Sequence, residues 1–435
     1  MISGEQNDAE LNVEYIKTTK LEKYKNNPRT HSNDQINQIA LSIKEFGFTN
    51  PILLDDNGTL IAGHGRVEAA KNLGMKELPC IRLSHLNEKQ RRAYIIADNK
   101  LAENAGWDQN LLALEFKYLD DLDFDLSLTG FELPEIDILL DTDAEQDNEA
   151  DVIPELEGDI VTKLGDLWLL GGHKLLCGNA LDPKNYEILL ENKKVQLVFT
   201  DPPYNVPVNG HVCGKGSIQH DEFSMASGEM SESEFKDFLS KIIQNLITFS
   251  IDGSLHFICM DWRHMKELLS AGEQYTELKN LCVWNKTNAG MGSFYRSKHE
   301  LVFMFKNGLG KHINNVELGK HGRHRTNVWD YAGINTFSEN RDEELSMHPT
   351  VKPVSMIKDA ILDCTKREDI VLDCFGGSGS TLIAAQQSKR KSYLIEVDPK
   401  YVDTTLMRFQ KETNLDPIHL QSGKTYDQLK EERHG

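Results

Sequence analysis

The segment with the clearest chemical potential is Asp201-Pro202-Pro203-Tyr204, which directly follows a largely apolar run over residues 195–200. Proline fixes φ and lacks a backbone N–H, so two successive prolines predict a stiff loop with unpaired carbonyl groups. A carboxylate and such a carbonyl can accept both hydrogens of an exocyclic aromatic amine, which frees its lone pair to attack a methyl sulfonium. Tyr204 offers a face for an extruded base. The alternative is an ordinary turn capped by Asp201.

A glycine-rich segment from Phe375 to Ser380 predicts a ligand-binding turn, because glycine lets backbone N–H groups approach a ligand closely. Its spacing is not GxGxxG, and a plain tight turn is the alternative. About twenty residues later a second apolar run ends at Glu396, where a carboxylate can hold ribose hydroxyls. This pair predicts a nucleoside cofactor without deciding between NAD and S-adenosylmethionine. The Asp201 segment favours S-adenosylmethionine.

Both segments follow predicted strands. Residues 195–200 lead into Asp201, and residues 369–373 lead into the glycine-rich turn. From Gly165 to about Thr413, strand and helix patterns alternate, which predicts a parallel sheet with helices on both faces. Open α/β sheets bind ligands at the carboxyl ends of their strands, so both segments are expected at one edge.

With these motifs the region from Gly165 to Thr413 resembles the amino-methyltransferases of DNA. Thr200-Asp-Pro-Pro-Tyr-Asn205 resembles their catalytic motif, and residues 371–381 (VLDCFGGSGST) resemble their cofactor loop. Three further segments match, at 297–306, 348–353 and 393–401. The catalytic motif precedes the cofactor loop, as in the β group of these enzymes. The resemblance implies an α/β fold with a Rossmann-like, circularly reordered S-adenosylmethionine-dependent methyltransferase sheet.

The resemblance also implies roles for individual residues. The base site would comprise Asp201, Pro202, Pro203 and Tyr204, with Asn205 shaping the loop. The cofactor would be bound by Asp373, Phe375, Gly376, Gly377, Gly379, Glu396 at the ribose, Asn179 near the adenine, and Thr350 and Lys352 at the methionine end. A purely stabilising role in the sheet is the alternative, above all for Lys352. His299 and Glu300 are as easily structural as functional, and no metal site is expected.

The N-terminal residues resemble a second family. Asn27-Pro-Arg-Thr-His31, Gly47 to Ile52, and Ile61-Ala-Gly-His-Gly-Arg66 are similar to the ParB N-terminal domain, which binds CTP in partition proteins. Only one arginine, Arg66, remains where that family has two. CTP therefore stays doubtful as a second ligand, and a scaffold or DNA-positioning role is an equal alternative. We expect a small α/β ParB-like domain at 12–105, an acidic helical arm and linker at 106–156, and a methyltransferase domain at 157–420.

The charge distribution bears on a nucleic-acid partner. The 435 residues carry a net charge of -20, but residues 108–159 hold eighteen Asp and Glu against one basic residue, Lys117. The acidity is thus local. The segment from Lys306 to Trp329 is basic, and Lys320, Arg323 and Arg325 are its expected contacts with DNA phosphates.

The composition indicates a soluble, reduced cytoplasmic protein. The seven cysteines are scattered without a CxxC pair, and no apolar stretch approaches the length of a membrane span. The start of the chain lacks the pattern of a signal peptide. A bacterial, phage or prophage context follows by analogy only.

The sequence therefore predicts transfer of a methyl group to N6 of a flipped adenine in double-stranded DNA. Methylation of cytosine N4 is the main alternative, and Asp rather than Ser before Pro-Pro favours adenine. RNA and protein glutamine are lesser alternatives. A non-catalytic ParB-type DNA-binding or nucleotide-switch protein is the alternative outside enzymes. The recognition sequence, a homodimer and a restriction partner stay open.

Overall fold

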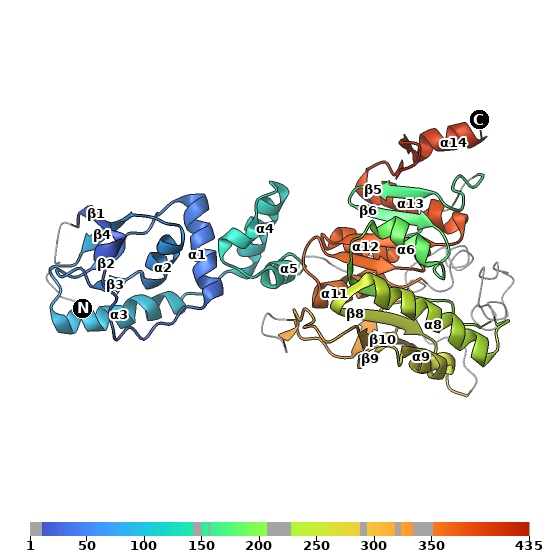
Figure 1. Cartoon of the computed structure of the whole chain (residues 1–435), viewed down its shortest axis with the longest axis horizontal. Coiled ribbons are helices and arrows are strands. Elements are labelled where there is room, and N and C mark those ends of the chain that lie inside the picture. Colours follow the sequence, from blue (N-terminus) through green and yellow to red (C-terminus); the bar gives the residue numbers. More distant parts are fainter. Residues whose placement is uncertain are drawn as a thin grey trace. The chain divides into compact units, whose positions relative to one another are not determined.

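The computed structural model describes residues 11–141, 150–154, 156, 158–206, 228–287, 294–317, 323–333 and 351–434. The chain divides into two compact units, Met1–Asp143 and Ala144–Gly435. Both units are drawn in Figure 1.

The first unit is built on a small mixed sheet. Its strand order is β1-β4-β2-β3, with β2 parallel to β4 and the other two pairings antiparallel. The strands are β1 (Val13–Lys17), β2 (Ile52–Leu54), β3 (Leu60–Ala62) and β4 (Glu77–Arg82). The helices beside them are α1 (Asn33–Phe46), α2 (His64–Asn72) and α3 (Glu88–Glu103). The turn between β2 and β3 contains Gly58 at φ 84°, a backbone conformation that favours glycine.

The ends of α1 follow from local sequence signals. Ser32 caps the start by accepting a hydrogen bond from the N–H of Gln35. Gly47, at φ 80°, ends the helix, and its N–H donates to the carbonyl of Ile43. This helix carries the apolar residues Ile36, Ile39, Ala40 and Ile43 at helical spacing, and the two short strands after it are also apolar.

The acidic stretch after α3 contains a small core of its own. It comprises α4 (Gln109–Asp121), a 3₁₀ turn η2 (Leu126–Thr129) and α5 (Leu133–Asp141). Phe116, Leu126, Ile136 and Leu139 are buried against one another. The apolar residues that interrupt the acidic sequence therefore pack together, while the carboxylates stay at the surface.

The second unit is organised around a single large sheet, which has 11 strands among the described residues. The order is β11-β9-β10-β8-β7-β12-β13-β6-β5-β14-β15. The strands are β5 (Leu167–Leu170), β6 (His173–Cys177), β7 (Val195–Thr200), β8 (Ser250–Met260), β9 (Glu277–Lys286), β10 (His299–Lys306), β11 (Val328–Tyr331), β12 (Ile370–Asp373), β13 (Lys391–Glu396), β14 (Ile418–His419) and β15 (Lys424–Thr425). The central five, β8 to β6, run parallel.

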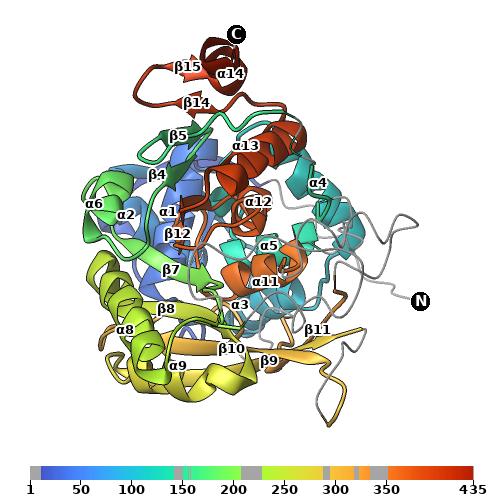
Figure 2. The ribbon, with the colours of Figure 1, turned by 90° about the vertical axis from the view of Figure 1, so that its right-hand side faces the viewer.

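Helices cover both faces of this sheet, as Figure 2 shows. One face carries α6 (Pro183–Leu190), α8 (Glu232–Phe249) and α9 (Met265–Gly272). The other carries α11 (Val354–Cys364), α12 (Ser380–Gln387) and α13 (Pro399–Thr413). A last helix, α14 (Tyr426–His434), follows β15. The two helical layers explain why the central strands are buried on both sides.

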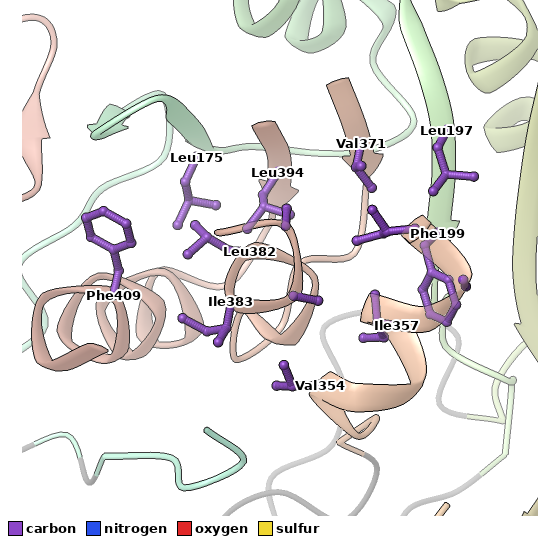
Figure 3. Close-up of a cluster of buried hydrophobic side chains, with 14 of the residues drawn as sticks. Leu175, Leu197, Phe199, Val354, Ile357, Val371, Leu382, Ile383, Leu394 and Phe409 are labelled. Atoms are coloured by element: carbon purple, nitrogen blue, oxygen red, sulfur yellow. The ribbon is translucent and has the colours of Figure 1, made fainter. Parts of the chain in front are cut away.

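The sheet has a hydrophobic cluster on each of its two faces, because successive residues of a strand point to opposite faces. Leu197 and Phe199 belong to the cluster under α11, α12 and α13, whereas Val198 belongs to the cluster under α6, α8 and α9. Figure 3 shows the first cluster, with Leu175, Leu394 and Val371 of the sheet facing helical side chains. The α/β fold with a reordered parallel sheet is therefore as predicted. This rigid core holds the strand ends that carry the motifs.

None of the helices in the described ranges is long and apolar enough to cross a membrane.

Candidate active site

Four neighbouring parallel strands bring the predicted site residues to one edge of the sheet. Their order is β7-β12-β13-β6. At their carboxyl ends lie Asp201 after β7, Phe375 after β12, Glu396 ending β13, and Asn179 after β6. Segments that are far apart in the sequence thus meet, as expected of an open parallel sheet.

Asp373 joins the catalytic segment to the glycine-rich turn. Its carboxylate accepts hydrogen bonds from the hydroxyls of Thr200, at 2.8 Å, and Thr381, at 2.7 Å. It also accepts from the N–H of Phe375 at 3.0 Å. Burial raises the pKa of Asp373 to about 7, although these donors oppose the shift. The two motifs are therefore braced against each other through one buried carboxyl group.

The glycine-rich turn adopts a conformation that requires glycine. Gly377 has φ 50° and Gly379 has φ 85°, both in the left-handed region. A Cβ on Gly379 would lie 2.7 Å from Cγ2 of Thr405, and one on Gly376 would lie 3.4 Å from Cβ of Leu394. The turn leads into α12 without a side-chain cap, so the start of that helix can present backbone N–H groups to a ligand.

The carboxylate of Glu396 fits a ribose-binding role. It is buried at 8% exposure, and it accepts from the N–H of Gly377 at 2.8 Å and the N–H of Asp398 at 2.9 Å. Burial raises its pKa, against those backbone hydrogen bonds. Each oxygen has one further lone pair that a ligand hydroxyl could use. The neighbouring Asn179 uses its side-chain oxygen on the N–H of Leu181 at 2.9 Å.

The corner after β7 is held rigidly by Tyr204 and Asn205. The Tyr204 hydroxyl donates to Asp201 Oδ1 at 2.6 Å and lies 3.2 Å from Glu300 Oε2. Asn205 has φ 53°, and its side-chain oxygen accepts from the backbone N–H groups of Gly228 and Met230, both at 3.1 Å. Pro202 is buried and Pro203 half-buried. The four residues of the predicted base site therefore form one fixed corner.

Lys352 joins this corner through Asp201. Its Nζ lies 2.5 Å from Asp201 Oδ2 and 3.1 Å from Glu300 Oε2, and its exposed fraction is only 4%. Glu300 also pairs with Lys286 on the neighbouring strand β9. Sequence reasoning left Glu300 open and missed Lys286. The only sequence signal for Glu300 is the matched segment 297–306, and Lys286 has none.

The electrostatics of this group are strongly coupled. Burial raises the pKa of Asp201, although the nearby Lys352 opposes the shift. Burial alone would raise the pKa of Glu300, but Lys352 and Lys286 outweigh it and lower the pKa to about 2. Burial alone would lower the pKa of Lys352, but the two carboxylates hold it well above its usual value. Glu300 and Lys352 therefore stay charged at neutral pH.

The predicted DNA contacts need a correction. Arg323 is buried at 8% exposure, and its guanidinium bonds to Asp363 at 2.9 Å and Asp359 at 3.0 Å. Arg325 bonds to the same two carboxylates, at 3.2 Å and 3.0 Å. These arginines tie their segment to α11, where two aspartates already pair with their guanidinium groups. Lys320 and Thr350 lie outside the described residues.

This correction leads to a test. We expect Arg323→Ala to lower the free energy of unfolding by about 2–3 kcal/mol, because it removes charged hydrogen bonds and leaves buried carboxylates uncompensated. Urea denaturation measures the loss, with Lys311→Ala, an exposed lysine nearby, as the control. The salt dependence of DNA binding should not change. A stable variant with a flatter salt slope would restore Arg323 as a phosphate contact.

In the first unit, Arg66 also serves the protein backbone. Its Nη1 donates to the carbonyls of Asn50, at 2.5 Å, and Pro51, at 3.2 Å. Burial lowers its pKa, against the nearby Asp98. The one arginine retained from the ParB pattern thus anchors the loop before β2.

Three family models match successive parts of the chain. They are the ParB N-terminal domain at residues 3–99, the ParB-methyltransferase HTH domain at 110–164 and the DNA methylase family of N6/N4 methyltransferases at 195–407. The second covers the segment for which the sequence predicts a helical arm and linker.

Individual proteins match in the same pattern. The ParB-like nuclease domain-containing protein YnaK of Escherichia coli is 48% identical over 82 residues, which are 19% of this chain and 94% of that protein. The type II methyltransferase M.HpaI of Haemophilus parainfluenzae is 23% identical, over 55% of this chain and 75% of its own length. The DNA adenine methyltransferase YhdJ of E. coli is 25% identical, over 50% and 76%.

Among solved structures, the cytosine-N4-specific PvuII DNA methyltransferase aligns over 60% of this chain and 91% of its own, with 16% identity and a TM-score of 0.43. The family models, the relatives and the motif geometry converge on one identity. Residues 195–407 therefore form a domain of the N6/N4 family of S-adenosylmethionine-dependent DNA methyltransferases, and a ParB-like domain lies at the N-terminus.

Proposed function

We propose that this enzyme transfers the methyl group of S-adenosylmethionine to N6 of adenine in double-stranded DNA. The observation that carries the proposal is the half-buried corner Asp201 to Tyr204, which follows β7, the strand beside β12 and its glycine-rich turn. The proposed acceptor for the amine and the proposed turn for the nucleoside therefore follow neighbouring strands, β7 and β12.

Asp201 has the geometry to activate the amine. The lone pair of an exocyclic amine is delocalised into the ring, so its nitrogen is a weak nucleophile. The Asp201 carboxylate and a carbonyl of the following prolines would accept its two hydrogens and let the lone pair localise. Tyr204 would stack on the flipped base, and its hydrogen bond to Asp201 fixes the ring relative to the carboxylate. No covalent enzyme intermediate is needed.

The residues at the neighbouring strand ends suit the cofactor. Glu396 would accept the ribose hydroxyls, and Gly376, Gly377 and Gly379 would let the backbone approach. Asn179 lies on the adjacent strand end, where it can contact the adenine ring. When bound, the cofactor supplies an electrophilic methyl group on a positively charged sulfur. The nearby carboxylates of Asp201 and Asp373 favour such a positive charge.

Adenine is preferred over cytosine because the residue before the two prolines is Asp201. The adenine methyltransferase YhdJ is among the relatives, whereas the family model covers both N6 and N4 amines. Both reactions need the same amine geometry. The choice of base therefore depends on how the ring fits beside Tyr204.

Single-molecule sequencing of DNA from cells that express the enzyme would test this proposal. We expect N6-methyladenine at a recurring sequence motif, and no such signal in cells that express Asp201→Ala. N4-methylcytosine at the motif would show that the base methylated by the enzyme is cytosine and not adenine. Unmodified DNA, together with transfer of labelled methyl groups to another substrate, would overturn it.

A further inference from the structure

Four charged side chains and one tyrosine form a connected group beneath the proposed base site. Lys286 comes from β9, Glu300 from β10, Lys352 from the residues just before α11, and Asp201 and Tyr204 from the corner after β7. Positive and negative groups alternate along the series Lys286, Glu300, Lys352, Asp201. Lys286, Lys352 and Tyr204, from three separate parts of the chain, therefore all contact the carboxylate of Glu300.

The contacts close into a ring around Glu300 and Asp201. Lys352 Nζ bridges the two carboxylates, at 3.1 Å from Glu300 Oε2 and 2.5 Å from Asp201 Oδ2. The Tyr204 hydroxyl bridges the same two, at 3.2 Å and 2.6 Å. The ammonium of Lys352 also lies 5.5 Å from the centre of the Tyr204 ring. Glu300 therefore holds both groups that restrain Asp201.

A purely stabilising role would require only one ion pair, and this arrangement contains more charged groups than that. Burying charges is costly, and apolar residues of similar volume are often as stabilising. Lys352 and Asp201 alone would neutralise each other. Glu300 adds a second negative charge that competes with Asp201 for the same lysine, and Lys286 then offsets that charge from the outer side. The extra pair changes how strongly Lys352 holds Asp201.

We propose that Glu300 is a positioning residue for methyl transfer: it shares Lys352 with Asp201 and fixes the Tyr204 hydroxyl, so that Asp201 is held in place yet free to accept the base amine. This inference rests on the proposed function. Without Glu300, Lys352 would pair more strongly with Asp201, and the amine would have to compete with that stronger ion pair. Lys286 offsets the negative charge of Glu300. It therefore determines how strongly Lys352 is attracted to Glu300 relative to Asp201.

The sign of the pH effect follows from the charged groups around Asp201. The groups that face Asp201 and Glu300 are Lys352, Lys286, Tyr204, Cys259 and Asp373. Glu300 raises the pKa of Asp201 through like-charge repulsion. Removing its charge should lower that pKa, so activity should persist to lower pH. Removing Lys286 should do the opposite, because Glu300 then draws Lys352 away from Asp201.

The test compares Glu300→Gln and Lys286→Gln with the wild-type enzyme. For Glu300→Gln we expect kcat to fall about 10- to 100-fold, the range for losing charged hydrogen bonds. The KM for S-adenosylmethionine should change less, because the contacts of Glu300 are with Tyr204, Lys286 and Lys352. The acid limb of kcat/KM should move to lower pH in Glu300→Gln and to higher pH in Lys286→Gln.

Glu277→Gln is the matched control, because it makes the same chemical change on an exposed residue of the same sheet. It should leave kcat and the pH profile unaltered. Lys286 is partly exposed, so its variant remains informative even if Glu300→Gln folds poorly. Acid limbs that stay in place, or move in the same direction in both variants, would overturn the positioning role. Inactive wild-type enzyme on every DNA would instead refute the proposed function.

Discussion

Asp201→Ala is expected to reduce methyl transfer by at least about 10²–10³-fold, the cost of losing one preorganised electrostatic contact to the reacting group. The reason is that Asp201 offers the half-buried carboxylate beside Tyr204, and alanine cannot accept a hydrogen from the amine. Cofactor binding should persist, because the glycine-rich turn and Glu396 are held by other contacts.

Two measurements separate these effects. Transfer of labelled methyl groups to DNA reports catalysis, and isothermal titration reports the affinity for S-adenosylmethionine. Asp237→Ala, which removes an exposed carboxylate on α8, is the control and should retain activity. Undiminished transfer by Asp201→Ala would remove Asp201 from the reaction. A loss of cofactor affinity as large as the loss of transfer would place it in the cofactor site instead.

Lys352→Met should have the second largest effect, on stability as well as activity. It removes the only cation that touches both Asp201 and Glu300 among the described residues. Breaking a buried ion pair by deleting one partner typically costs about 3–5 kcal/mol. Asp201, without its ammonium, should then protonate more readily and lose its capacity as an acceptor at neutral pH.

Urea denaturation of Lys352→Met gives the stability change, and Lys366→Met, an exposed lysine just after α11, is the control. The double variant Asp201→Ala with Lys352→Met should be more stable than the sum of the single losses predicts, because the two groups interact directly. Strict additivity of the two losses would show that the pair contributes no coupling energy.

These expectations share one physical basis, which is the desolvation of the corner after β7. A carboxylate in water gains little from a nearby lysine, because solvent screens the charges. At 4% exposure Lys352 is not screened in this way, so its position determines the state of Asp201. The methylation chemistry and the folding stability therefore depend on the same contacts.

The motifs and their places on strand ends could be predicted from the sequence. Residues 195–200 read as a buried strand, and the Pro-Pro pair must end it, because proline cannot donate to the sheet. The turn of Gly377 and Gly379 likewise lies where the sequence predicts it, at the end of β12. Such features depend on neighbouring residues alone, so local rules suffice.

Charge pairing between distant segments could not be predicted in this way. Arg323 and Arg325 form a basic cluster in the sequence, yet Asp359 and Asp363, more than 30 residues further along the chain, pair with both. A count of charges in one segment takes no account of a helix that follows it in the sequence and packs against it in the fold. For this reason the sequence did not reveal that Arg323 and Arg325 pair with acidic side chains of α11.

What the sequence determined by itself is the set of chemical groups: an acidic double-proline corner, a glycine-rich turn and the Glu396 carboxylate proposed to bind ribose, each at the end of a strand. Only the tertiary structure decided that Glu300 and Lys286 join Lys352 around Asp201. The reason is that strand order brings β9, β10 and β7 into one sheet, and the desolvation that makes their charges matter arises only when the sheet is covered.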